Sequence, residues 1–338
     1  MGLKPIRKIP VCQPFLAGRE LDYVTEAVRT GWISSSGQYV TAFENEFAKY
    51  CGVRHGIAVC NGTMAIHLAL VALGIGPGDE VIVPDFTMIA SAAAVIYAGA
   101  RPVFVDVDKD TWNIDAKRIE ERITTQTKAI MPVSVFGNPC EMDAITAVAQ
   151  KYKLYVIEDA AESHGAEYRG RKTGSLADIT AFSFFANKNL TTGEGGMVVT
   201  DSAELADCCR YFKNLCFPLN GSRNYMHADI GFNYRMSNLH AAIGLAQVEK
   251  ADDYRAMRIR NADLYKKFLA DVPGIVFQKD TDRAMNVHWM NAILLVPEMF
   301  GATRDQLMEY LNKNGVETRL LFSGMHHQPC LKKSGCDC

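Results

Sequence analysis

Polar side chains stand where several short apolar runs of this sequence end. Asp159 closes one such run, while Gly62 and Thr63 open a helical pattern directly after another. Lys188 follows an aromatic run and precedes the glycine-rich stretch Thr191–Gly196. If these runs are strands of a parallel sheet, their carboxyl ends lie along one edge. The spacing therefore predicts one site that combines a carboxylate, an amine and a helix N-terminus.

Each feature also has an ordinary structural explanation. A Gly-Thr pair can cap a helix, a strand-end aspartate can be ion-paired, and a loop lysine usually faces solvent. Together they match the groups that pyridoxal phosphate (PLP) needs: a phosphate cradle, a carboxylate for the pyridinium nitrogen and a lysine for the Schiff base. The released lysine can then carry a proton between the substrate carbon and C4′ of the cofactor.

Signatures of other enzyme classes are missing. The sequence has no G-x-G-x-x-G after a strand, no G-x-x-x-x-G-K-[ST], no H-E-x-x-H and no G-x-S-x-G. None of the ten cysteines forms a Cys-x-x-Cys pair, so we expect no metal site.

Charge and composition exclude further classes. Lys and Arg number 36 against 38 Asp and Glu, which argues against nucleic-acid and membrane-surface partners. The N-terminal ten residues lack the apolar stretch of a signal peptide, so we expect a cytoplasmic protein. The uncharged stretch His55–Gly78 contains Asn61 and a glycine-rich turn. It predicts a buried strand, turn and helix rather than a membrane span.

The elements that would position the site alternate between residues 55 and 215. This alternation of apolar runs and helical patterns predicts an α/β fold with a mainly parallel seven-stranded sheet flanked by helices. The expected strands are Gly56–Cys60, Glu80–Pro84, Pro102–Val107, Lys128–Val133, Leu154–Asp159, Ile179–Phe185 and Gly196–Thr200. The expected helices are Met64–Leu73, Met88–Ala98, Ala116–Ile123, Met142–Tyr152 and Ala203–Lys213, with a loop and hairpin over Ala160–Asp178.

A long amphipathic pattern then runs from Ser237 to about Ala270, and its length predicts a kink. A smaller α/β domain should follow it. Its expected strands are Gly274–Gln278, His288–Val296 and Val316–Leu321, with a helix that starts in a Thr303–Gln306 capping box. We therefore expect a large PLP-binding domain over residues 1–250 and a small domain over 251–338.

Four segments resemble the PLP-dependent nucleotide-sugar aminotransferases of the DegT/StrS family, which have fold type I. These segments are Ile157–Ala166, Phe182–Lys188, Thr191–Gly196 and Gly231–Asn238. The resemblance runs from Pro14 to about Pro329, and within the family the chain is most similar to the GDP-perosamine synthases.

The resemblance implies roles for the residues that match the family's cofactor site. Lys188 would form the Schiff base, Asp159 would pair with the pyridinium nitrogen, and Glu162 would contact the ring oxygen. The phosphate would be held by Gly62, Thr63 and Ser183.

The resemblance also implies a homodimer with shared active sites. Asn233, together with Arg235, would reach the phosphate of the neighbouring subunit; the alternative is that both belong to the helix cap before Ser237. Trp32 and Ser34 of the loop Trp32–Gly37, with Arg235 and His326, would lie near the nucleotide sugar.

Two departures from the family pattern stand out. Met88 occupies the position where the family stacks an aromatic side chain on the cofactor, so we expect weaker cofactor retention. Family members also continue for some tens of residues beyond the last residue of this chain. We therefore expect an incomplete small domain with exposed apolar residues near Leu320–Phe322.

The resemblance implies transfer of an amino group from glutamate to a keto-deoxysugar nucleotide through PLP on Lys188. The expected acceptor is GDP-4-keto-6-deoxymannose or a similar sugar, aminated at C4. A PLP-dependent sugar dehydratase is one alternative, although relatives of that type carry histidine at the Lys188 position. A non-catalytic PLP- or sugar-binding relative is another.

Overall fold

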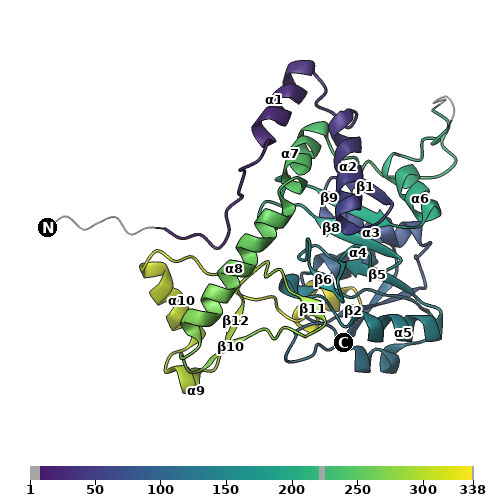
Figure 1. The fold of residues 1–338 in the computed structure, drawn as a ribbon. Helices are drawn as coiled ribbons and strands as arrows, with labels where there is room; N and C mark the ends of the chain where they lie inside the picture. The colour runs from purple at the N-terminus through teal and green to yellow at the C-terminus, as the bar shows by residue number, and fades with distance from the viewer. Residues whose placement is uncertain (1–7, 221–224, 337–338) are drawn as a thin grey trace.

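The computed structural model describes residues 8–220 and 225–336. At its centre are seven strands: β1 (His55–Val59), β2 (Glu80–Pro84), β3 (Arg101–Val105), β4 (Thr127–Ile130), β5 (Tyr155–Asp159), β8 (Ile179–Ser183) and β9 (Gly196–Thr200). They form one sheet in the order β1-β9-β8-β5-β4-β2-β3 (Figure 1). All neighbours are parallel except β9, which runs antiparallel to β1 and β8. The predicted mainly parallel seven-stranded sheet is therefore confirmed.

Helices cover both faces of this sheet. One face carries α3 (Gly62–Ala72), α4 (Ala90–Tyr97) and α6 (Ala203–Lys213). The other face carries α1 (Glu20–Thr30), α2 (Gln38–Cys51) and α7 (Asn238–Val248) over the β1 end, and α5 (Met142–Tyr152) over the β3 end. Successive side chains along a strand point to opposite faces of the sheet. Because helices cover both faces, the side chains on both faces of each central strand are apolar.

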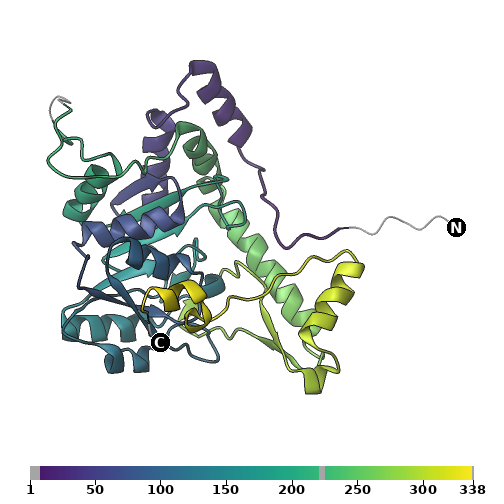
Figure 2. The ribbon, with the colours of Figure 1, turned by 180° about the vertical axis from the view of Figure 1, so that it is seen from behind.

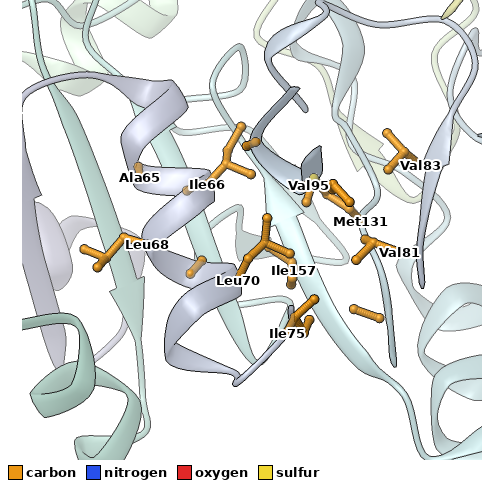
Figure 3. Close-up of a cluster of buried hydrophobic side chains, with 14 of the residues drawn as sticks. Ala65, Ile66, Leu68, Leu70, Ile75, Val81, Val83, Val95, Met131 and Ile157 are labelled. Carbon is orange, nitrogen blue, oxygen red and sulfur yellow. The ribbon is translucent and has the colours of Figure 1, made fainter. Parts of the chain in front are cut away.

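The α3 interface shows why this stretch of sequence is almost free of charge. Figure 3 shows Leu70 of α3 beside Ile157 of β5, with Val81 and Val83 of β2 farther along the same apolar cluster. Ile82, between the two valines, packs on the opposite face with the α5 cluster. The segment His55–Gly78 thus forms β1, a cap, α3 and a turn, as predicted. No helix in the described part of the chain is long and apolar enough to cross a membrane.

The predicted long helix is two helices. α7 ends at Val248, and α8 (Ala251–Leu269) begins after a break at Glu249–Lys250. In Figure 1, α8 leads diagonally from the sheet to the C-terminal elements. These are β10 (Ile275–Phe277), β11 (Ala284–Met285), β12 (Ile293–Leu295), α9 (Pro297–Phe300) and α10 (Arg304–Lys313). β10 pairs with β12, and β11 joins the hairpin of β6 (Glu167–Tyr168) and β7 (Arg171–Lys172).

The last described residues return to the sheet. The short helices η4 (Met325–His327) and α11 (Pro329–Lys333) lie beside the sheet layers rather than with α9 and α10 (Figure 2). Met325 and Leu331 are buried in the same cluster as the α3 side chains. The C-terminal segment therefore contributes to the packing of the large sheet.

Some sequence predictions were wrong in detail. The helix expected over Ala116–Ile123 is instead two 3₁₀ turns, Ala116–Arg118 and Glu120–Arg122, because only Ile119 of this segment is fully buried and little packing supports a continuous α-helix. No strand forms over Val316–Leu321, where Val316 makes a single bridge to Ile9 in the described chain.

Two further corrections concern the C-terminal elements. The strand expected over His288–Val296 is shortened to β12, because the backbone N–H groups of Val287 and Trp289 bond to the carbonyls of Gly137 and Phe136 rather than to β10, and His288 between them has a positive φ of 47°. Leu320 is exposed as expected, but Phe322 is half-buried and stacks on Phe136, with ring centroids 5.4 Å apart.

Candidate active site

The N-terminus of α3 packs against the carboxyl end of β8. Asn61 caps the helix, since its Oδ1 accepts a hydrogen bond from the backbone N–H of Met64 at 2.9 Å. A Cβ atom on Gly62 would lie 2.6 Å from Cβ of Ser183, so only glycine permits this approach. The arrangement brings Gly62, Thr63 and Ser183 to one place beside unpaired N–H groups, which is a suitable cradle for phosphate.

Asp159 ends β5 and is 4% exposed. Its Oδ2 accepts a hydrogen bond from Oγ of Ser91 at 2.7 Å, and its Oδ1 accepts one from the backbone N–H of Ala161 at 3.1 Å. Burial raises the pKa of this carboxyl, while the Ser91 hydrogen bond and the Lys188 charge act in the opposite direction. A cationic partner such as a protonated ring nitrogen would favour its ionised form.

Lys188 follows β8 and faces a second carboxylate. Its Nζ lies 3.8 Å from Oε1 of Glu162, whose Oε2 accepts a hydrogen bond from the backbone N–H of Phe136 at 2.8 Å. Burial lowers the pKa of Lys188, and the Glu162 and Asp159 charges partly offset this. Burial likewise raises the pKa of Glu162 to about 7. A buried amine with a lowered pKa is suited to nucleophilic attack.

His164 is buried behind these groups. Its ring is surrounded by Phe47, Phe182 and Phe184, and neither ring nitrogen has a hydrogen-bond partner in the described part of the chain. Burial, followed by the Lys188 charge, lowers its pKa to about 3. The imidazole is therefore neutral at physiological pH.

Met88 lies in the loop between β2 and α4 and is 49% exposed. Its carbonyl accepts the backbone N–H of Ser91, so this loop and the Asp159 partner belong to one turn. Neighbouring Phe86 instead packs edge-on against Phe136 and Phe322.

Asn233 and Arg235 lie together at the open edge of β1. Arg235 forms an isolated bridge with Val59, and its Nη2 donates to Oδ1 of Asn233 at 2.8 Å. Its Nη1 donates to Oδ1 of Asn214 at 3.1 Å. Within the described residues, no hydrogen bond or ion pair joins Asn233 or Arg235 to Lys188 of the same chain.

The predicted sugar-contact residues occupy two other places. The carbonyls of Trp32 and Ser34 accept hydrogen bonds from Nδ2 and the backbone N–H of Asn238 at 2.7 and 2.5 Å. Nδ1 of His326 lies 2.5 Å from Oδ2 of Asp85, which ends the β2 segment. The Trp32 side chain is 59% exposed, so its indole is available to another group.

Sequence reasoning missed several residues of the site. Ser91 is the one serine in the alanine-rich helix α4, which is a usable signal. Asn238 had been regarded only as part of a motif. Nothing in the local sequence around Phe136 or Trp289 indicates that they approach Lys188.

The residues fit PLP. A phosphate cradle, a buried aspartate and a buried lysine lie at the carboxyl ends of neighbouring elements, and buried Oδ1 of Asn187 beside the lysine lacks a partner in the described chain. No group of three or more potential metal ligands occurs among the described residues. A lysine and an aspartate so arranged on a mainly parallel sheet define the fold type I class of PLP-dependent enzymes.

Comparison with known proteins narrows this class. The sequence profile of the DegT/DnrJ/EryC1/StrS aminotransferase family matches residues 14–337, and the chain belongs to this family. A GDP-perosamine synthase of Caulobacter vibrioides is 49% identical over 328 residues, which are 97% of this chain and 88% of the relative. A GDP-perosamine synthase of Escherichia coli O157:H7 is 46% identical over 96% of this chain and 87% of its own length.

Solved structures agree with this assignment. DesI in the presence of its TDP-sugar product is 34% identical with a TM-score of 0.88, over 96% of this chain and 82% of that one. A Streptococcus pneumoniae chain solved in its PLP form has a TM-score of 0.90 at 27% identity, over 98% and 89% of the two chains. The protein is a PLP-dependent aminotransferase that acts on nucleotide sugars.

Proposed function

We propose that this enzyme transfers the amino group of glutamate to C4 of GDP-4-keto-6-deoxymannose or a close analogue. The observation that carries the proposal is the Lys188–Glu162–Asp159 cluster, found in a chain 49% identical to a GDP-perosamine synthase. The dehydratase alternative is disfavoured because the reactive position holds lysine rather than histidine. Intact Lys188, Asp159 and Ser183 argue against a non-catalytic relative.

Each residue has a definite task in this proposal. PLP, when bound, supplies an aldehyde that joins amines and a pyridine ring that accepts the electrons of a carbanion. Asp159 holds the ring nitrogen in its charged form, and Ser91 orients Asp159. Gly62, Thr63 and Ser183 bind the phosphate. Nζ of Lys188 would carry the proton to and from the substrate carbon.

Glu162 and Met88 act on the remaining sides of the ring. Glu162 would contact the ring oxygen, where its carboxyl, whose pKa burial raises to about 7, could hold or release a proton. Met88 supplies a thioether contact in place of an aromatic stack, which predicts weaker cofactor retention. Trp32, Ser34, Arg235 and His326 would contact the nucleotide sugar.

We further propose a cytoplasmic homodimer in which Asn233 binds the phosphate held by the neighbouring subunit. The exposed position of Asn233 at the β1 edge supports this assignment, because its amide is available to a second chain. The break at Glu249–Lys250 supports a boundary between a large unit and a small unit near residue 250. Met325 and Leu331, which were expected in the small unit, pack with the large unit instead.

The first test is spectroscopic. Purified protein with PLP should show the visible band of lysine-bound cofactor, and glutamate should convert it to the shorter-wavelength pyridoxamine form. Adding GDP-4-keto-6-deoxymannose should restore the visible band and yield an amino sugar detectable by mass spectrometry. The TDP- and UDP-linked keto sugars serve as competitors for the nucleotide preference.

Lys188→Ala is the decisive variant. It should lose the visible band and essentially all turnover, while Lys172→Ala, at a lysine outside the site, should retain both. Full turnover by Lys188→Ala would refute the proposal. A band that glutamate leaves unchanged would refute glutamate as the donor.

A further inference from the structure

Trp289 lies against the reactive lysine although the two are far apart in sequence. It stands between β11 and β12 and is 6% exposed. Nζ of Lys188 lies 3.8 Å from the centroid of its indole ring. The same Nζ lies 3.8 Å from Oε1 of Glu162. The amine is therefore bounded by a carboxylate and by an aromatic face.

The indole also fixes the backbone that carries Lys188. Nε1 of Trp289 donates a hydrogen bond to the carbonyl of Asn187 at 2.8 Å. The N–H of the same peptide group, from Lys188, donates to the carbonyl of Phe185 at 2.9 Å. Both ends of this peptide group are thus held, and the direction in which the lysine side chain leaves the backbone is fixed.

Trp289 is itself held from several directions. Its backbone N–H donates to the carbonyl of Phe136 at 2.8 Å, and its carbonyl accepts from Nη1 of Arg258 on α8 at 3.2 Å. Its ring stacks on Phe136 at a centroid distance of 6.3 Å. Phe136 in turn donates its N–H to Glu162, which faces Lys188. Trp289, Phe136, Glu162 and Lys188 are thus linked by contacts into a ring around the amine.

Backbone strain at two residues in or next to this ring of contacts favours a functional role for the contacts. Phe136 has φ of 56° and His288 has φ of 47°, a left-handed conformation that is unfavourable for a bulky residue. Such conformations persist where the surrounding contacts require them. Here Phe136 accepts the hydrogen bond from the backbone N–H of Trp289, and His288 directly precedes Trp289.

We propose that Trp289 is a positioning residue for Lys188. Its N–H fixes the peptide group before the lysine, and its ring closes one side of the amine, so that Nζ is directed toward Glu162 and Asp159. This inference rests on the proposed role of Lys188 as the cofactor lysine. It also makes the segment after α8 part of the proposed site, because Trp289 contacts the amine and Arg258 of α8 donates a hydrogen bond to the Trp289 carbonyl.

Two substitutions separate the two contacts. Trp289→Phe keeps an aromatic face and removes the N–H, whereas Trp289→Leu removes both. We expect kcat to fall about tenfold in the first and further in the second, with KM changed by less than about twofold. The visible circular dichroism of bound PLP should weaken in the same order, because that signal reports how the lysine-linked ring is held.

Trp112→Phe is the matched control. Trp112 is 5% exposed and packs edge-on against the same Phe136, but no contact with Lys188 is found among the described residues. It should therefore leave kcat and the dichroic band near wild type. Equal effects of Trp112→Phe and Trp289→Phe, or an unchanged band in Trp289→Phe, would overturn the proposal.

Failure of this inference is distinguishable from failure of the proposed function. If Lys188→Ala keeps its visible band and turnover, the role of Lys188 is wrong. If Lys188→Ala loses both while Trp289→Phe behaves as wild type, only the positioning role is wrong. Thermal unfolding of each variant identifies a loss that is merely structural, and a drop in melting temperature with an unaltered band counts against the proposal.

Discussion

Three buried carboxylates lie close together in this chain: Glu158, Asp159 and Glu162. Burying a carboxylate is costly unless it is paired or hydrogen-bonded. The positive charge of Lys188 acts on both Asp159 and Glu162. The Glu158 side chain instead bonds near the β6–β7 hairpin, where its Oε2 accepts a hydrogen bond from the backbone N–H of Gly174 at 2.9 Å. We therefore propose that the two groups that face the lysine are the ones with a role in the chemistry.

We expect Ser91 to lower the pKa of Asp159. Its hydrogen bond stabilises the ionised carboxylate, so Ser91→Ala should raise the pKa of Asp159 further and weaken its hold on a protonated ring nitrogen. We expect the PLP dissociation constant, measured by absorbance titration, to rise about tenfold. Ser163→Ala removes another fully buried hydroxyl nearby, one that bonds the carbonyl of Ala160, and should change the constant less than about twofold.

Glu158 should make stability depend on pH. Burial raises its pKa from 4.5 to about 7, so the folded protein binds more protons than the unfolded chain between these values. The free energy of unfolding therefore falls as pH rises from about 4.5 to 7, and the loss is complete above that range.

Glu158→Gln cannot ionise and tests this directly. The variant should gain stability relative to wild type by roughly 3 kcal/mol between pH 4.5 and pH 8, as measured by urea unfolding. The slopes due to Glu162 and His164 are present in both proteins and cancel in the difference. A stability difference that stays constant with pH would contradict the assignment.

At the scale of elements, α2 is capped by a residue from α7. The N-cap of α2, Gly37, has no side chain, and Oδ1 of Asn238 accepts the N–H groups of Tyr39 and Val40 at 3.0 and 3.3 Å instead. The same side chain donates from Nδ2 to the carbonyl of Trp32. One buried amide thus joins two helices to the loop predicted to contact the sugar.

Two substitutions of Asn238 separate these contacts. Asn238→Ala loses the helix cap and the loop contact, and should cost about 2 kcal/mol in urea unfolding. Asn238→Asp keeps the acceptor for α2 and replaces the donor to the Trp32 carbonyl with a second carboxylate oxygen. Both should raise KM for the nucleotide sugar, but Asp should recover most of the stability. Equal destabilisation by the two variants would exclude the capping role.

The sequence predicted elements best where burial and periodicity coincide. β2, β9, α5 and α6 have the predicted bounds, because their apolar periodicity is bounded by clear caps and turns. The errors fall where partners decide the outcome. Val316 lacks a strand ladder in the described chain, and Ala116–Ile123 buries only Ile119 fully, so that little packing supports a continuous helix.

The site was predictable to the same degree. Lys188 and Asp159 follow strands, so their position at one sheet edge could be inferred from alternation. Trp289 reaches Lys188 only because the chain turns at His288 and bonds to Phe136. That turn depends on contacts between residues far apart in the sequence, and such contacts produce no periodic pattern in the sequence.

At the scale of the whole molecule, the candidate phosphate cradle and the pair Asn233–Arg235 both lie at the carboxyl end of β1, yet no contact links the pair to Lys188 in the described residues. An exposed asparagine beside an arginine at a sheet edge suits an anion held by another chain. The proposed shared dimer accounts for this placement, because a twofold axis would bring each edge to the partner's cradle.

Mixed dimers test this arrangement. Lys188→Ala and Asn233→Ala chains, co-expressed with different tags and purified as mixed dimers, each lack one group. If Asn233 acts across the interface, one of the two sites in each mixed dimer is complete, and activity should return to about half of wild type. If Asn233 acts within its own chain, neither site is complete and activity stays absent.

The reciprocal pairing gives the opposite result and completes the test. A chain carrying both Lys188→Ala and Asn233→Ala, paired with a wild-type chain, has no complete site if Asn233 serves the partner, because the only intact lysine then meets the altered asparagine. The same mixed dimer keeps about half of the activity if each subunit is self-sufficient. Because the two pairings contain the same substitutions in total, a difference between them cannot come from stability or expression and must reflect which chain supplies Asn233.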